Sequence, residues 1–180
     1  MSRPQLLSRG GDQAFRQFVH DTLAFAGRIQ AIRNALGSVI GLSGTQYTIL
    51  IAIARDQHSK GIGINHVAEL LHFSPAFVTI EVNKLVAAKL ITKKTHPGDR
   101  RRVVLATTSK AEELLRSLTA VQRPINDMLF EELTADDFER LRQKMPELVN
   151  SAGRALRLFD LLVKTGTEPA AAQKGRKSKA

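Results

Sequence analysis

The sequence contains no cysteine and no tryptophan, and aromatic residues make up only 5% of its 180 residues. The lack of cysteine excludes a disulfide scaffold, a thiolate metal site and a cysteine redox sensor. The scarcity of aromatic residues argues against single-strand nucleic-acid binding by base stacking. No apolar run reaches the length of a membrane span, and the first ten residues are too short and polar for a signal peptide. We therefore expect a cytoplasmic protein with no membrane partner.

Negative charge is also scarce, because 27 Lys and Arg residues stand against 17 Asp and Glu residues, for a formal net charge of +10. This balance favours a polyanionic partner, meaning nucleic acid or an anionic membrane surface. A protein that merely carries excess surface cations is the alternative, so charge alone does not decide. At 43% hydrophobic residues, the chain has enough apolar side chains for one domain with a real core.

The signatures of an enzyme are missing as well. The sequence shows no nucleophile–base pairing, no glycine-rich phosphate loop and no cluster of metal ligands. His66 and His72 are six residues apart, a poor spacing for two ligands on one helical face, and His20, His58 and His96 lie elsewhere. We expect no enzymatic activity, no metal and no cofactor.

Helical signals dominate the first half of the chain. Apolar residues recur at helical spacing over Asp12–Leu36, which predicts one long amphipathic helix whose end is bracketed by Gly37 and Gly41. Ser43 and Gln46 then form a capping box, which predicts a second helix from about residue 44 to residue 54.

A helix-turn-helix and a hairpin are predicted next. A short helix is predicted over residues 65–71, with His72 in the turn that follows it. Ser74-Pro75 opens a further helix that runs to about Lys89, because serine is a favoured N-cap and proline fits the first helical position. Its inward stripe is expected at Val78, Val82 and Leu85.

Two strands, at residues 90–95 and 102–106, are predicted to enclose the turn 96–101. Three consecutive arginines start at Arg100 in this segment, so the element is a basic β-hairpin, or wing. A merely solvated turn is the alternative.

The C-terminal third predicts helices with a coiled-coil-like seam. The capping boxes are Ser109 with Glu112 and Thr134 with Asp137. Pro124 is expected to kink or split the first helix, and Pro146 and Gly153 are expected to bend or break the second. The seam of the second helix follows a three-four spacing and consists of Phe138, Leu141, Met145, Leu148, Ala152, Ala155, Phe159 and Leu162.

The expected fold class is mainly α with a small β-hairpin wing, a winged helix-turn-helix with N- and C-terminal dimerisation helices. The expected parts are a flexible N-terminus (1–11), a long N-terminal helix that contributes to dimerisation (12–40), a winged helix-turn-helix DNA-binding lobe (41–108), C-terminal dimerisation helices (109–163) and a disordered basic tail (164–180).

Across about residues 12–162, the sequence resembles the MarR family of bacterial transcription regulators. The wing is the most specific piece, because residues 97–102 through Thr108 are similar to the family's wing with its Asp-x-Arg signature. Each piece is weak alone, and their order and spacing together carry the resemblance. The other matching pieces are Gly41–Tyr47 with Leu50, Val67–Leu70, and Ser74–Thr79 with Val82 and Leu85.

The resemblance implies a DNA interface, since a helix-turn-helix places its second helix in the major groove. The wing can place an arginine near the adjacent minor groove. A plain exposed helix face is the alternative. Asp99 either holds the wing arginines or is an ordinary turn aspartate. The candidate DNA-binding residues are Ser74, Ala76, Phe77, Thr79, Ile80, Asn83, Lys84, Arg100 and Arg101.

Three residues depart from the family's pattern. Ile80 stands where a basic residue is frequent, Glu81 where many members have an apolar residue, and Lys89 where a glycine commonly closes the helix. The second helix therefore offers few hydrogen-bond donors to base edges, although apolar contact with thymine methyl groups remains open to it.

The resemblance also implies a two-fold dimer and, in many members, a small aromatic or phenolic anionic effector. The seam and the long first helix are the candidate dimer surface, with intramolecular packing as the alternative. For the aromatic residues near the effector, an ordinary core position is the alternative. The candidate pocket residues are Phe18, Phe25, Arg28, Tyr47 and Arg116.

The sequence thus favours a sequence-specific DNA-binding regulator, a repressor that acts as a homodimer on a pseudo-palindromic duplex site and is released by an effector. The alternative is a winged-helix module for protein–protein interaction, which Phe77 and Ile80 would also suit.

Overall fold

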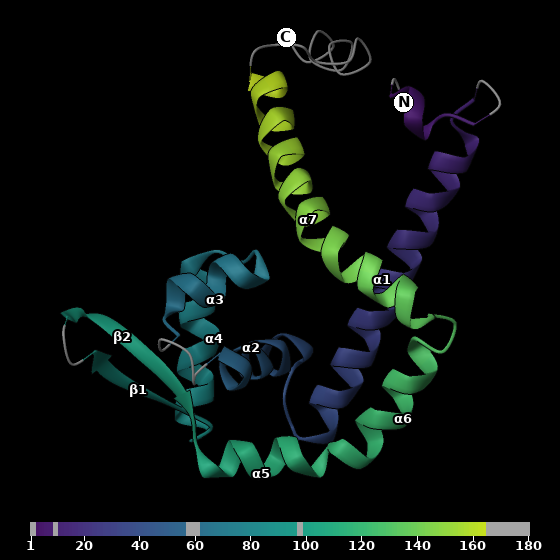
Figure 1. Ribbon diagram of the computed structural model, residues 1–180. Coiled ribbons are helices and arrows are strands. Elements are labelled where there is room, and N and C mark those ends of the chain that lie inside the picture. The colour runs from purple at the N-terminus through teal and green to yellow at the C-terminus, as the bar shows by residue number, and fades with distance from the viewer. Residues whose placement is uncertain (1–2, 9–10, 57–61, 97–98, 165–180) are drawn as a thin grey trace, which may run out of the picture. The chain divides into compact units, whose positions relative to one another are not determined.

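The computed structural model describes residues 3–8, 11–56, 62–96 and 99–164, and for residues 96 and 99–102 it describes the backbone alone. The chain divides into two compact units, Met1–Asn126 and Asp127–Ala180. The described part is mainly helical, with one two-stranded sheet, which confirms the expected fold class (Figure 1).

The first unit begins with a one-turn 3-10 helix, Pro4–Leu6, and the long helix α1, Gln13–Val39. The helix runs past the predicted end at Leu36, and Gly37 lies inside it; Gly41, with φ of 73°, forms the turn that follows. Helix α1 is amphipathic, and only its last turns are buried.

Helix α2, Gly44–Asp56, is the central helix of the lobe. The predicted capping box is confirmed, because Ser43 N donates to Gln46 Oε1 at 3.1 Å and Gln46 N donates to Ser43 Oγ at 3.2 Å. A Cβ atom on Gly44 would lie 1.7 Å from Asn34 Oδ1, so the close approach of α2 to α1 requires glycine at this position.

Helices α3, Ile64–Leu71, and α4, Pro75–Ala87, are joined by a three-residue turn. His72 ends α3 in the left-handed conformation with φ of 54°, and Phe73 N closes the turn on Ala68 O at 3.0 Å. Ser74 caps α4 as predicted, because its side chain accepts a hydrogen bond from Phe77 N at 3.2 Å. The two helices form the predicted helix-turn-helix.

Lys89 closes α4 with φ of 60°, and Leu90 N donates back to Leu85 O at 2.9 Å. This is the arrangement in which a helix end usually carries glycine, because a left-handed residue with a Cβ atom costs about 1–2 kcal/mol. Lys89 in place of glycine therefore carries a conformational cost in the structure.

The hairpin consists of β1, Ile91–His96, and β2, Asp99–Thr107, paired antiparallel from Ile91 opposite Thr107 to His96 opposite Asp99. Strand β1 has the predicted length but lies one residue later, and β2 begins three residues earlier than predicted, so the expected turn over 96–101 is wrong. The register shifts between Thr95, which lies opposite Val103, and His96, which lies opposite Asp99. Ile62 adds an isolated bridge to Leu105.

The core of the lobe joins these elements. All thirteen members of its main cluster are at most 3% exposed, and they come from α2, α3, α4, the hairpin and α5, together with Ile62 before α3 and Leu90 before β1. The predicted inward stripe of α4 belongs to it, since Val78 and Val82 are 0% exposed and Leu85 is 1% exposed. By area, a fully buried side chain of this size contributes about 1.5–3 kcal/mol to folding, so the inner face of α4 is a main anchor of the lobe.

Helices α5, Ser109–Ser117, and α6, Thr119–Leu129, follow the hairpin. The predicted cap at Ser109 is wrong by one residue, because Thr108 accepts from Ala111 N at 3.2 Å and also donates to Lys89 O at 2.8 Å. The break between the helices falls at Leu118, while Pro124 lies inside α6. Leu118 is 1% exposed and packs in a second cluster with Leu36 and Tyr47, which accounts for a break away from the proline.

The second unit consists mainly of α7, Ala135–Lys164. The predicted capping box is confirmed, because Asp137 N donates to Thr134 Oγ1 at 3.2 Å and Thr134 N donates to Asp137 Oδ2 at 3.3 Å. The helix is continuous across Pro146 and Gly153, so the expected break is wrong, while the alternative, a bend, stays a prediction. Lys164 is its last residue, and the rest of the predicted tail lies outside the described residues.

Candidate nucleic-acid interface

Helix α4 has two unlike faces. Opposite the buried stripe, Phe77 is 40% exposed and Ile80 is 54% exposed, and Ala76, Asn83 and Lys84 are exposed as well. Most of the candidate DNA-binding residues of this helix therefore share its outer surface. The surface is apolar except for one amide and one ammonium group.

Two hydroxyl candidates, the N-cap Ser74 and Thr79 of α4, hydrogen-bond to the backbone of the helix itself. Ser74 Oγ accepts the capping bond, and Thr79 Oγ1 donates to Pro75 O at 2.8 Å. Thr79 is also half-buried. Phe77 is held from one side by Phe73, whose ring lies at 5.3 Å between centroids in an edge-to-face arrangement. The first turn of α4 is thus internally fixed.

A buried carboxylate lies between α4 and α2. Glu81 is 7% exposed, and its Oε2 accepts from Gln46 Nε2 at 3.2 Å while its Oε1 accepts from Lys84 Nζ at 2.7 Å. Gln46 therefore has two functions, because the same side chain also completes the capping box of α2. The sequence marked Glu81 as a departure, whereas its partners Gln46 and Lys84 were not foreseen.

The hairpin is tied to α4 by a polar contact. Lys93 Nζ of β1 donates to Asn83 Oδ1, and both residues are exposed. Lys94, next on the strand, is exposed too. Lys93 was not predicted from the sequence. The available signal was the tight turn between α4 and β1, because it places the first lysines of the strand beside the helix.

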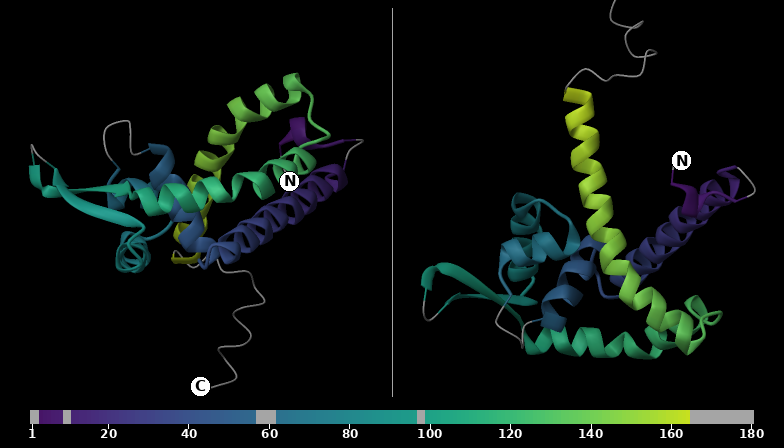
Figure 2. Two further views of the ribbon diagram at one scale, coloured as in Figure 1. Left: turned by 90° about the horizontal axis from the view of Figure 1, so that it is seen from below. Right: turned by 45° about the horizontal axis from the view of Figure 1, so that its top comes forward.

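The wing candidates Asp99, Arg100 and Arg101 lie on β2, and their backbone is extended. Their side chains are outside the described part, so the expected contact between Asp99 and the arginines stays a prediction. The turn residues 97–98 are likewise outside it. Both views in Figure 2 show the hairpin extending away from the helices of the lobe.

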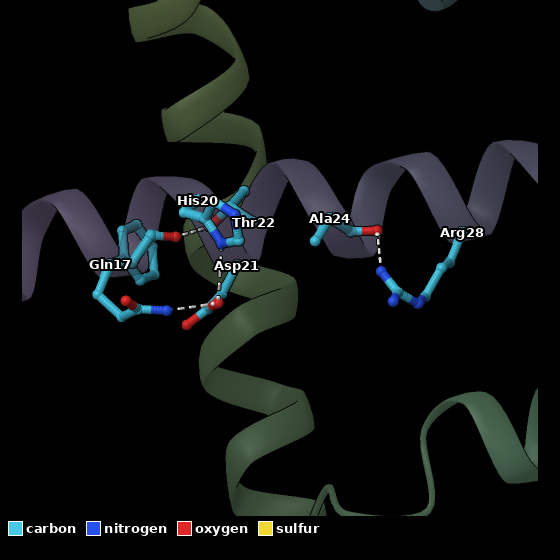
Figure 3. Close-up of polar contacts among 7 residues, drawn as sticks. Gln17, His20, Asp21, Thr22, Ala24 and Arg28 are labelled. Carbon is cyan, nitrogen blue, oxygen red and sulfur yellow. Dashed lines mark hydrogen bonds and ion pairs between the residues drawn. The ribbon is translucent and has the colours of Figure 1, made fainter.

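The candidate effector residues lie on three helices, α1, α2 and α5, and the pocket stays a prediction. Phe18 is 62% exposed and Phe25 is 41% exposed on α1, and Arg116 is exposed on α5. Arg28 donates to the backbone oxygen of Ala24 at 3.1 Å on its own helix (Figure 3). One of the aromatic candidates occupies a core position, which was the alternative to an effector contact.

That aromatic residue is Tyr47. It is 2% exposed and packs with Leu36 and Leu118. Burial raises the pKa of the Tyr47 phenol, and the charge of Arg33 opposes this shift. The phenol is therefore neutral near pH 7 and serves the core.

The histidines whose side chains the structure describes, His20, His66 and His72, form no metal site with neighbouring residues. His66 Nε2 lies 3.7 Å from Asp56 Oδ2, and within residues 3–8, 11–56, 62–96 and 99–164 no group of three His, Cys, Asp or Glu residues could hold a metal ion. His58 falls outside the described residues.

Comparison with known proteins agrees with this geometry. A family model described as MarR family matches residues 40–102, the span from the end of α1 to the arginines of β2. Over these residues, the winged-helix lobe is similar to the MarR family. Among curated proteins, none matches the sequence.

Solved structures share the fold of this chain at low identity. The transcriptional regulator SlyA is 13% identical with a TM-score of 0.64, over 79% of this chain and 98% of SlyA. MarR from Oenococcus oeni PSU-1 is 17% identical with a TM-score of 0.62, over 73% of this chain and 98% of that one. A mutant MarR from E. coli complexed with operator DNA is 17% identical with a TM-score of 0.59, over 76% of this chain and 94% of that one.

No single helix among the described residues is long and apolar enough to cross a membrane. The pair α1 and α2, bent by 87° at their junction, passes the same test only in combination, and α2 is the buried central helix of the lobe.

Proposed function

We propose that this chain is a cytoplasmic transcription regulator that binds duplex DNA through the outer face of α4 and the basic hairpin. The most direct support is that the exposed outer face of α4 lies beside a hairpin rich in Lys and Arg. Both elements lie in a lobe that matches the MarR family model. In a helix-turn-helix, that face enters the major groove. The E. coli relative complexed with operator DNA has the same fold.

The regulator acts as a homodimer in this proposal. On α7, Phe138 is 57% exposed and Phe159 is 64% exposed, and every other residue of the predicted seam is exposed as well. An apolar face of this length is unusual on a monomer. A second copy that buries it would place two winged lobes on one pseudo-palindromic site, with half-sites about one helical turn apart.

The dimer can be tested with Leu141→Glu and Leu148→Glu, which place charge on the seam. Sedimentation of the wild type should give a dimer, and the double variant should dissociate. Glu147→Gln, an exposed position on the same helix whose carboxylate pairs with Lys144 at 3.0 Å, is the matched control. A wild type that sediments as a monomer contradicts the dimer.

Repression and release by a small aromatic or anionic effector complete the proposal. An effector would act by shifting the population between dimers that can and cannot place both lobes on DNA. Because Tyr47 is a core residue and Phe18 and Phe25 are exposed, the support for the effector is the family resemblance alone.

DNA binding is tested by selecting bound fragments from random duplexes and by titrating salt. A protein that neutralises phosphates loses affinity steeply between about 50 and 200 mM salt. We expect an enriched two-fold motif and this steep loss. Arg101→Ala should weaken binding to every sequence, while Arg123→Ala, an exposed arginine on α6, should not.

A protein–protein interaction module is the second candidate, and the exposure of Phe77 and Ile80 favours it. The same selection separates the two functions. If the selected pool contains no enriched sequence and binding ignores salt, the apolar face of α4 serves a protein partner instead.

A further inference from the structure

Asn83 is oriented by a residue from another element. Lysine can only donate hydrogen bonds, so the amide atom of Asn83 that faces Lys93 Nζ is the oxygen. The Nδ2 group with its two N–H donors then points elsewhere. Among the described residues, Nδ2 makes no hydrogen bond, and Asn83 is exposed on the outer face of α4.

The pair therefore presents donors only. Asn83 offers the two N–H groups of Nδ2, and the Lys93 ammonium keeps two N–H groups after the bond to Asn83. Of the four bases, guanine alone shows two acceptors and no donor in the major groove, its N7 and O6 atoms. Adenine adds an N6 donor, cytosine shows an N4 donor, and thymine shows one acceptor beside a methyl group.

We propose that Asn83 and Lys93 together form a specificity-determining site that selects guanine in each half-site. This inference rests on the proposed DNA-binding function. An unrestrained asparagine favours adenine, because its oxygen accepts from N6 while its nitrogen donates to N7. Lys93 donates to that oxygen and places a positive charge where the N6 hydrogens of adenine would lie. The preference of Asn83 therefore changes from adenine to guanine.

The contact itself is weak in the free protein. Both residues are exposed and water competes for their hydrogen bonds, so the contact orients Asn83 only weakly in the free protein. Closing the interface excludes water, and the same charge then acts in a lower dielectric. The preference for guanine is thus established largely in the complex.

The test uses the full-length protein. Duplexes are selected with the wild type, and each guanine of the half-site is then replaced by adenine in matched duplexes for affinity measurement. At one base pair, the wild type should favour guanine by about tenfold or more, as expected for a good bidentate contact. Lys93→Met, which keeps the length of the side chain, should lose this preference and move toward adenine, and Asn83→Ala should lose discrimination at the same base pair.

Two controls isolate the pair. Lys93→Arg keeps a donor-only side chain and should retain the guanine preference. Lys94→Met removes the neighbouring cation of β1, so it should lower affinity for all sequences without changing the preferred base. Because Asn83, Lys93 and Lys94 are exposed, their variants should have the same denaturant midpoint of unfolding as the wild type.

The outcomes distinguish this inference from the proposed function. An enriched motif in which no guanine depends on both Asn83 and Lys93 overturns the inference and leaves DNA binding intact. No enriched motif at all, with binding that ignores salt, overturns both. A guanine preference that Lys93→Met abolishes and Lys93→Arg retains supports the inference.

Discussion

The outer face of α4 and the hairpin differ in charge although both belong to the candidate interface. Helix α4 contains one carboxylate and one ammonium group, Glu81 and Lys84, and these are paired at 2.7 Å. The hairpin carries Lys93, Lys94 and three arginines against Asp99 alone. The helix is therefore neutral and apolar, whereas the hairpin is strongly basic.

This difference implies a division of tasks between the two elements. Phosphate neutralisation gives affinity without sequence information, and contacts to base edges give specificity. The hairpin has the charge for the first task. The helix has Phe77, Ile80 and Asn83 for the second, with Lys93 as the one hairpin residue that joins them, and its buried inner face anchors it in the lobe. The variants below test this division.

The largest effect is expected from the inner face of α4. Leu85→Ala should lower the free energy of unfolding by about 2–5 kcal/mol, because it leaves a cavity in the lobe core. Leu85 is 1% exposed, whereas Ile80 is 54% exposed on the opposite face. Ile80→Ala is the control and should change stability by no more than about 0.5 kcal/mol while it alters DNA preference. Denaturant unfolding measures both, and equal losses would contradict the two-faced helix.

The next effect concerns the basic hairpin. Arg100→Ala with Arg101→Ala should flatten the slope of log affinity against log salt by about 0.9 for each phosphate that the variant no longer neutralises. Binding should weaken on specific and random duplexes alike. Lys84→Ala is the comparison on the helix, and it should flatten the slope less because Glu81 already neutralises Lys84. A larger change in slope from Lys84→Ala would reverse the assigned division.

A smaller effect of opposite sign is expected at Glu81. Glu81→Gln keeps the size of the side chain but removes the charge that pairs with Lys84. The released ammonium can neutralise a phosphate, so binding to random DNA should strengthen and the salt slope should steepen by about 0.9. Glu69→Gln, an exposed carboxylate on α3, makes the same change in net charge and controls for it. Equal behaviour of the two variants would mean that overall charge, and not release of Lys84, is responsible.

The features that were predictable from the sequence are those decided within a few residues. The caps at Ser43, Ser74 and Thr134 depend on bonds to amides three positions ahead, so their local pattern was sufficient. The same holds for the inward stripe of α4, because helical periodicity alone places Val78 and Val82 on one face.

The features that were missed depend on distant partners. Thr108, and not Ser109, caps α5 because Thr108 is also bound to Lys89 O and Leu90 O across the lobe. The helix break at Leu118 depends on packing against α1 and α2, which the proline pattern does not contain. In the site, the contact between Lys93 and Asn83 joins a strand to a helix. Periodicity along one element cannot reveal such pairs.

The smallest effect is expected where helix and hairpin meet, at Lys89. Its left-handed conformation costs about 1–2 kcal/mol, and glycine would remove that cost while adding about 0.5–1 kcal/mol of chain entropy. Lys89→Gly should therefore raise the free energy of unfolding by roughly 0.5 kcal/mol. Lys89→Ala keeps the strained backbone and removes the same cation, so it should not stabilise the lobe.

Comparing the two Lys89 variants separates strain from charge. If Lys89 contacts a phosphate, both should flatten the salt slope equally, since both lack the ammonium. Only the glycine variant should unfold at a higher denaturant concentration. If neither variant changes the salt slope, the positive charge of the interface begins at β1 and not at the end of α4. If Lys89→Gly is no more stable than Lys89→Ala, the left-handed backbone costs nothing here, and the lysine at this position needs no functional explanation.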